Sequence, residues 1–129
     1  MPVKETHLTE AVYEQLRHAM AADPAGFTAL YRDYLADARQ SLRLLRESIQ
    51  DRHIESVRAK AHYLRSGSLV LGAPDVARGA AMLEEAAIAG DSGSFDVLLE
   101  TIETAVNNTQ AELSERLGNS VLPVDETGA

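Results

Sequence analysis

The sequence predicts an all-α protein, an antiparallel up-down-up-down four-helix bundle with an additional short N-terminal helix. Three observations lead to this prediction. Apolar residues recur three and four residues apart from residue 8 onward, without the alternation of a half-buried strand. The connections between these segments are short, which favours antiparallel neighbours. The chain has 129 residues, 45% of them hydrophobic and 25% charged, a composition typical of one packed domain.

An Asp-Pro pair separates the first two helices. The first is expected at about residues 8–21, with Thr6 as its N-cap. Asp23 suits the N-cap and Pro24 the first position of a second helix of about 25 residues. The side chains expected to face inward are Leu8, Val12, Leu16 and Ala19 in the first helix, and Phe27, Leu30, Tyr31, Tyr34, Ala38, Leu42, Leu45 and Ile49 in the second.

Glycine and proline mark the bounds of the next two helices. The third is expected to begin near Asp51 and to end at Gly72. Pro74 opens the fourth, which covers roughly residues 74–89. The inward positions are Ile54, Val57, Ala61, Leu64, Ser68 and Leu71 in the third helix, and Val76, Ala80, Leu83, Ala87 and Ile88 in the fourth.

The fifth helix is expected at about residues 94–117, after a Gly-Asp-Ser-Gly loop. Residues 118–129 are small and polar, as in a flexible terminus. We therefore expect a single domain over residues 1–129, with its core in residues 8–117. The inward positions of the fifth helix are Phe95, Leu98, Ile102, Ala105, Val106, Thr109 and Leu113.

Composition excludes several classes of function. The chain has no cysteine, so disulfides, thiolate zinc sites and thiol nucleophiles are excluded. Its N-terminus lacks the apolar block of a signal peptide, and no run approaches the roughly 18 apolar residues of a membrane span. A formal net charge of −8 argues against nucleic-acid binding. We expect a soluble, cytoplasmic protein that binds neither nucleic acid nor membrane.

The outer face of the third helix carries an isolated histidine. At about 100° per residue, His62 points about 140° away from the centre of the inward stripe, so it is expected to face solvent. Small and apolar residues surround it on this face, namely Ala59, Ser66, Leu69 and Val70. Exposed patches of this kind usually bind a partner.

Positive charge gathers around the same histidine. The segment 56–74 contains no acidic residue, although the chain as a whole is acidic, and it contains Arg58, Lys60 and Arg65. Arg58 lies four residues before His62 and Arg65 three after it, so both can lie beside the imidazole. Such cations suit the binding of phosphate oxygens.

The segment 61–73, AHYLRSGSLVLGA, resembles the signature of histidine-containing phosphotransfer (HPt) domains. In that family Ala-His is followed by any residue, an apolar residue, Lys or Arg, usually Gly, and small residues, and Gly-Ala closes the helix. The sequence departs from the pattern at Ser66, where a serine narrows the docking space. The resemblance also covers the helix order over residues 8–117, the Asp-Pro start of the second helix and Leu83-Glu84-Glu85 in the fourth.

The resemblance implies that His62 accepts a phosphoryl group from a phospho-aspartate on one receiver domain and passes it to the aspartate of a response regulator. Arg65 would stabilise the phosphoryl oxygens, and Glu84 would orient the imidazole. The chain would be a phosphohistidine carrier without an ATP site or a cofactor of its own, because magnesium comes from the receiver. The partners would be receiver domains of a hybrid sensor kinase and of a response regulator, docking over Arg58, Ala59, Ser66, Leu69 and Val70.

Other interpretations stay open. A helical adaptor could dock a receiver or kinase through the same surface without carrying phosphate. Glu84, Arg58 and Lys60 are also compatible with solvated helix faces, and Leu69 and Val70 with covering the helix end. An enzyme with its own active site is disfavoured, because no phosphate loop, GxSxG or HExxH motif is present.

The remaining histidines are expected to be structural: His7, His18 and His53. All apolar stripes can be buried within one bundle, so we expect a monomer. Met1 and the short tail favour a stand-alone carrier. The upstream kinase, the downstream regulator, the direction of net flow and the output depend on partners that the sequence does not name.

Overall fold

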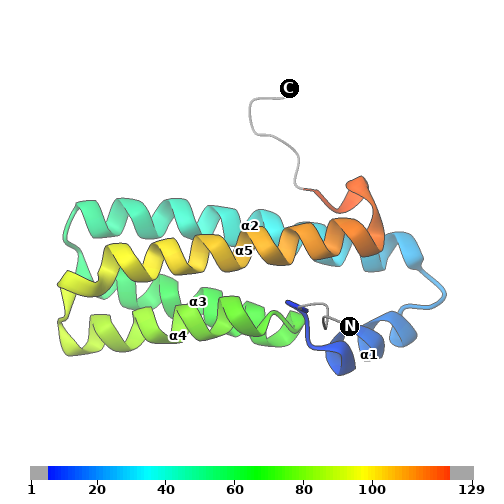
Figure 1. Cartoon of the computed structure of the whole chain (residues 1–129), viewed down its shortest axis with the longest axis horizontal. Coiled ribbons are helices and arrows are strands. Elements are labelled where there is room, and N and C mark those ends of the chain that lie inside the picture. Colours follow the sequence, from blue (N-terminus) through cyan, green and yellow to red (C-terminus); the bar gives the residue numbers. More distant parts are fainter. Residues whose placement is uncertain (1–5, 123–129) are drawn as a thin grey trace, which may run out of the picture.

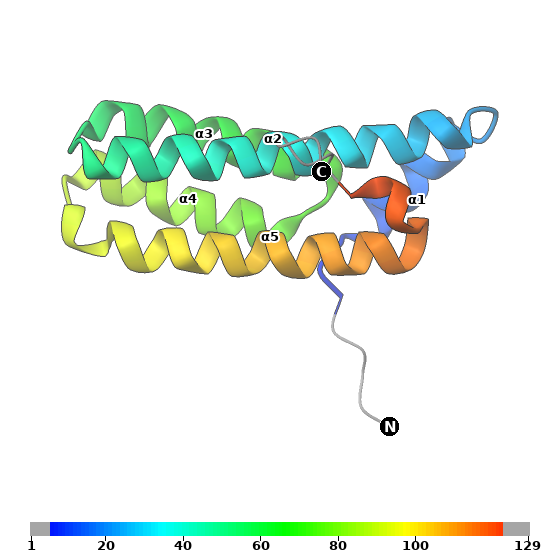
Figure 2. The same ribbon diagram turned by 90° about the horizontal axis from the view of Figure 1, so that it is seen from above.

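The computed structural model describes residues 6–122, and every regular element in this range is helical. Figures 1 and 2 show α2 and α5 running side by side along the whole molecule, with the shorter α3 and α4 packed against them. The all-α bundle is therefore confirmed. In order, the elements are α1 (Glu10–Ala19), α2 (Pro24–Gln50), α3 (Ile54–Leu71), α4 (Pro74–Ala89), the 3-10 turn η1 (Ser92–Ser94), α5 (Phe95–Leu117) and the 3-10 turn η2 (Asn119–Val121).

The short helix α1 occupies the space beyond the turn between α3 and α4 (Figure 1). Gly72 ends α3 in the left-handed conformation, with φ of 73°, and its carbonyl accepts a hydrogen bond of 2.8 Å from the Thr9 backbone N–H. A Cβ at Gly72 would lie 2.9 Å from the Cβ of Val12 in α1. Glycine therefore meets both the backbone and the space requirement of this turn.

The predicted start of α2 is confirmed. The Asp23 carboxylate accepts a hydrogen bond of 3.0 Å from the Gly26 backbone N–H, and Pro24 occupies the first helical turn. An N-cap of this kind stabilises a helix by about 1 kcal/mol. The long helix that carries one wall of the bundle thus begins where the sequence indicates.

A continuous core joins all four long helices. Burying a leucine or isoleucine side chain stabilises the fold by about 1.5–3 kcal/mol. Two tyrosines of α2 also fix the C-terminal turn of α3: the Tyr31 hydroxyl donates to the Leu71 carbonyl at 2.9 Å, and the Tyr34 hydroxyl lies 2.7 Å from the Ser68 hydroxyl. The largest fully buried side chains include Tyr31, Leu35, Leu45, Leu83, Ile102 and Leu113.

Some expected helix ends and inward positions are wrong. The cap of α1 is Thr9 rather than Thr6, and α3 begins at Ile54 because Arg52 has a positive φ of 56° and turns the chain. Ala19 is exposed, Ile54 is 40% exposed and Ile88 is 68% exposed. These residues lie in the end turns of their helices, where the packing within residues 6–122 leaves the apolar stripe exposed.

The expected flexible tail does not begin at residue 118. Gly118 has φ of 82° and lets the chain reverse into η2, where Val121 is fully buried against α2 and α5. Residues 118–122 therefore belong to the packed structure, while the rest of the expected tail lies outside the described residues. No helix within residues 6–122 is long and apolar enough to cross a membrane.

Candidate functional site

His62 lies on the outer face of α3, as its position in the helical period predicts. Val57, Ala61 and Leu64 fill the inward stripe and are at most 3% exposed. The side chain of His62 is 53% exposed. The burial of the apolar stripe therefore fixes the rotation of α3 and directs the imidazole away from the core.

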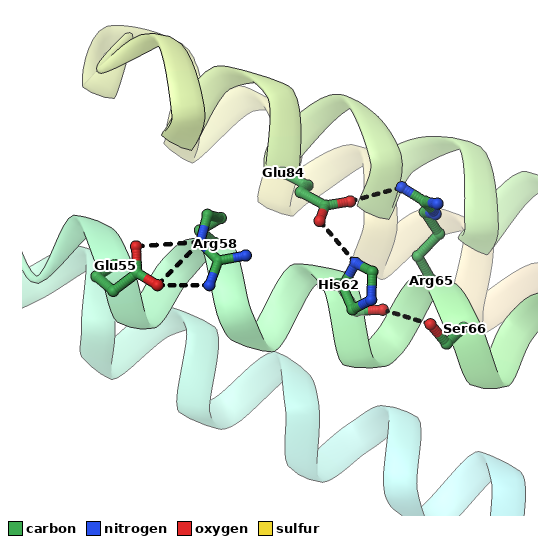
Figure 3. Close-up of polar contacts among 6 residues, drawn as sticks. All are labelled: Glu55, Arg58, His62, Arg65, Ser66 and Glu84. Carbon is green, nitrogen blue, oxygen red and sulfur yellow. Dashed lines mark hydrogen bonds and ion pairs between the residues drawn. The ribbon is translucent and has the colours of Figure 1, made fainter.

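A buried carboxylate on α4 holds the His62 ring (Figure 3). Oε2 of Glu84 lies 2.7 Å from Nδ1 of His62, and the Glu84 side chain is only 9% exposed. Because a carboxylate accepts hydrogen bonds, we infer that Nδ1 carries the proton and donates it. Nε2 then has a free lone pair, and residues 6–122 offer it no hydrogen-bond partner.

The same carboxylate binds a cation. Nη1 of Arg65 donates to Oε1 of Glu84 at 2.6 Å, so the two oxygens of Glu84 are divided between His62 and Arg65. A buried carboxylate is stable only when charge and hydrogen bonds compensate its lost hydration. Arg65 is 39% exposed and also remains within reach of a group that approaches from solvent.

Arg58 does not join this arrangement. Its guanidinium forms a two-pronged pair with Glu55, with Nε to Oε1 at 2.9 Å and Nε to Oε2 at 3.0 Å (Figure 3). This hydrogen bonding lowers the pKa of Glu55 and raises the pKa of Arg58. The sequence argument missed Glu55 because the acid-free segment begins one residue after it.

The expected docking residues lie on the surface around His62. Ala59 and Ser66 are exposed, Leu69 is 58% exposed and Val70 is 67% exposed. The Ser66 hydroxyl donates to the backbone carbonyl of His62 at 3.1 Å (Figure 3). Leu69 and Val70 therefore cover little of the helix end, and they present apolar surface on the helix that carries the histidine.

Sequence reasoning missed a contact beside this surface. The hydroxyl of Tyr63, which follows His62 in the chain, donates to Oδ2 of Asp37 in α2 at 2.5 Å. A groove of about 150 Å³ lies next to this pair between α2 and α3. Helical periodicity places both residues on outer faces, but the pairing depends on how two helices are rotated against each other.

The chemistry available at the site is that of an exposed imidazole next to an arginine. Among residues 6–122 no group of three or more histidine or acidic side chains could hold a metal ion. His7 lies 3.1 Å from Asp75, and His18 lies 3.6 Å from Glu14 on the exposed face of α1. In the described part of the chain, His62 differs from these histidines because its ring nitrogen binds a buried carboxylate that also binds an arginine.

Comparison with known proteins identifies the family. The family model described as Hpt domain matches residues 29–116, which is more than half of the chain. The fold is similar to the crystal structure of histidine-containing phosphotransfer protein B (HptB) from Pseudomonas aeruginosa PAO1, with a TM-score of 0.82, 24% sequence identity, and coverage of 88% of this chain and 96% of that one. No curated protein matches the sequence. Hpt domains act with receiver domains in phosphorelays, and by the family match this chain belongs to the Hpt domain family, with a phosphotransfer role in two-component signalling.

Proposed function

We propose that the chain is a histidine phosphotransfer intermediate in which His62 accepts a phosphoryl group from a receiver phospho-aspartate and passes it to the aspartate of a response regulator. The observation that carries this proposal is the hydrogen bond of 2.7 Å between Nδ1 of the half-exposed His62 and the buried Glu84. With Nδ1 as the donor, Nε2 keeps a lone pair that can attack phosphorus. The family match supports the same chemistry.

In the proposed step phosphoryl transfer requires no proton transfer at Nε2. The Nε2 lone pair forms a bond to phosphorus, the bond between phosphorus and the carboxylate oxygen of the donor aspartate breaks, and that carboxylate leaves with the electron pair. The phosphorylated ring keeps its Nδ1 proton and so becomes a cation. Glu84, 2.7 Å from Nδ1, stabilises that positive charge.

Arg65 would stabilise the transferring group. Its contact with Glu84 uses Nη1, and a guanidinium has five N–H donors in total. Phosphoryl transfer passes through a loose transition state, in which charge placed near the equatorial oxygens does much of the catalysis. Glu84 thus positions both side chains: Arg65 would contact the phosphoryl oxygens, and His62 would attack phosphorus.

The receiver partner would supply the remaining chemistry. In our proposal the magnesium ion and the acidic pocket belong to the receiver domains of a hybrid sensor kinase and of the response regulator, and the HPt chain contributes no cofactor. We propose that the chain acts in the cytoplasm as a monomer, without binding nucleic acid or membrane. The partners would dock over Ala59, Ser66, Leu69, Val70 and the Arg58 side of α3.

The test is transfer of radiolabel from a phosphorylated hybrid kinase or phospho-receiver to purified protein. Wild type and His18→Gln are expected to take up label that is acid-labile and alkali-stable, as phosphoramidates are, and His62→Gln is expected to take up none. His18 is a matched control because its side chain is also exposed, at 73%. Labelling of His62→Gln at the wild-type level contradicts the proposal, and a wild type that binds receivers without taking up label favours the adaptor function.

A further inference from the structure

The groove between α2 and α3 beside His62 has an unusual floor. Gly67 lies inside α3, four residues before its last residue Leu71, where its φ is not in the left-handed region, and a Cβ built on it would meet no atom within 4 Å. Glycine in a helix interior is less stable than alanine. Neither backbone conformation nor packing within residues 6–122 therefore requires a glycine at this position.

The walls of the groove are largely apolar. The rings of Tyr34 and Tyr63 and the side chains of Ala38 and Leu64 line it, and Ser66 connects it to His62 through a hydrogen bond to the His62 carbonyl. Its volume is about 150 Å³. Binding sites for small molecules usually measure about 300–1,000 Å³, so this groove suits one side chain of a protein partner better than a metabolite.

Tyr63 and Asp37 fix one rim of this groove. Tyr63 is 59% exposed, yet its hydroxyl is held at 2.5 Å by the Asp37 carboxylate across the gap between α3 and α2. The hydrogen bond directs the ring, which would otherwise turn freely in solvent. The Asp37 charge at the rim also disfavours an acidic side chain there.

We propose that this groove receives one apolar side chain of the docked receiver domain, and that Tyr63 and Asp37 set its width and so determine which receivers the chain serves. The inference rests on the proposed function, since a receiver that reaches Nε2 of His62 must cover the adjoining surface at Ser66. The open space above Gly67 is what admits the side chain. Tyr63 and Asp37 are specificity-determining residues in this proposal and not catalytic ones.

The experiment compares Gly67→Leu and Tyr63→Phe with wild type and with Asn108→Leu, which adds the same side chain at an exposed position of α5. Receiver domains from the chain's own genome are phosphorylated with acetyl phosphate and magnesium, and kcat/KM for transfer to each variant is measured. Labelling by phosphoramidate, a small donor that needs no docking, reports the reactivity of His62 separately. Circular dichroism melts show whether each variant is folded.

Gly67→Leu is expected to lose roughly tenfold or more in kcat/KM with phospho-receivers, through KM, while phosphoramidate still labels it and Asn108→Leu behaves as wild type. Tyr63→Phe, which keeps the ring but loses the hydrogen bond to Asp37, is expected to change the ratio of kcat/KM between receivers by about fivefold. Wild-type transfer by both variants with every receiver overturns the groove proposal and leaves His62 as the carrier. A wild type that neither phosphoramidate nor any phospho-receiver labels overturns the proposed function, and the groove proposal with it.

Discussion

Two buried glutamates hold two different regions of this molecule together. Glu84 in α4 is 7% exposed and binds His62 and Arg65 of α3. Glu112 in α5 is 6% exposed; its Oε1 accepts a hydrogen bond of 2.6 Å from the His7 backbone N–H, and its Oε2 lies 3.1 Å from Arg116. In each carboxylate one oxygen is paired with the charge of an arginine, and the other accepts a hydrogen bond from a different group.

The partners of the two carboxylates differ in exposure. At Glu112 the donor is a backbone N–H, and Arg116 is 24% exposed, paired also with Glu10 and stacked 4.7 Å from the centre of the Tyr13 ring. At Glu84 the donor is an imidazole with more than half of its surface open to solvent. A buried carboxylate with an arginine is therefore not in itself a sign of function, and the exposed imidazole is what distinguishes the site at Glu84.

The largest effect on phosphoryl transfer is expected at Arg65. In the proposed mechanism Arg65→Gln removes the cation that would lie beside the phosphoryl oxygens, and we expect the transfer rate to fall about 100-fold. The free energy of unfolding should fall by about 1 kcal/mol because Glu84 loses its charged partner. The loss is limited because Arg65 is partly exposed and solvent screens its charge. Rapid-quench transfer kinetics measure the rate. Arg78→Gln is the control, since Arg78 pairs with Asp75 on the exposed face of α4, and an equal loss of rate in that variant would contradict the assignment.

A smaller loss of rate is expected when the carboxylate that holds the ring is neutralised. Glu84→Gln keeps the shape of the side chain but removes the charge next to Nδ1, so the phosphorylated, cationic ring is less stable. We expect transfer to slow about 10- to 100-fold, toward the lower end of the range. Glu85→Gln, at the neighbouring exposed position, is expected to transfer at the wild-type rate. Transfer by Glu84→Gln at the wild-type rate would contradict the functional role that we assign to Glu84 and not to Glu112.

The corresponding change at the other glutamate should affect stability and leave transfer unchanged. Glu112→Gln removes the charge facing Arg116, and we expect the free energy of unfolding to fall by about 1–3 kcal/mol. Urea titration followed by circular dichroism measures it, with Glu100→Gln on the exposed face of α5 as the control. A loss of phosphotransfer in folded Glu112→Gln would show that the two regions are coupled, against this account.

The smallest effect concerns acid. The hydrogen bond from Arg116 lowers the pKa of Glu10 in the folded protein. A carboxyl group whose folded pKa is depressed contributes stability above its ordinary pKa and loses that contribution as pH falls through the folded value. We therefore expect the protection of the α1 amides against hydrogen exchange, relative to the intrinsic exchange rate at each pH, to fall selectively below about pH 4.5, near the ordinary pKa of glutamate. Glu10→Gln is expected to remove this dependence. An equal loss of protection in α3 would contradict a local role.

The sequence predicts the parts of the site that depend on one helix. The period of α3 places His62 outward and Val57 inward, and burial of the stripe produces that orientation. The Glu84 contact was expected through the family resemblance, and it is present. Periodicity could not predict the pairing of Arg58 with Glu55, because rotamers decide it, nor the bond between Tyr63 and Asp37, because it depends on the packing of α2 against α3.

The errors at chain ends have a similar cause. Ile88 continues the apolar stripe of α4, but α4 ends one residue later at Ala89, and the side chain of Ile88 is left exposed by the part of the chain that the structure describes. Val121 lies in a polar segment, and its burial follows from the chain reversal at Gly118. The apolar periodicity of a helix predicts which of its faces is buried. Burial at the ends of the helix depends on which other segments of the chain pack there.

A single spectrum can test the central claim that Glu84 holds the proton on Nδ1 of His62, so that phosphorus bonds to Nε2. The measurement is ¹⁵N and ³¹P NMR of the ¹⁵N-histidine-labelled protein after phosphorylation by a phospho-receiver. We expect phosphorus coupled to Nε2 of His62, with the Nδ1 proton retained in a hydrogen bond. Phosphorus on Nδ1 of His62, or on any other residue, would contradict it.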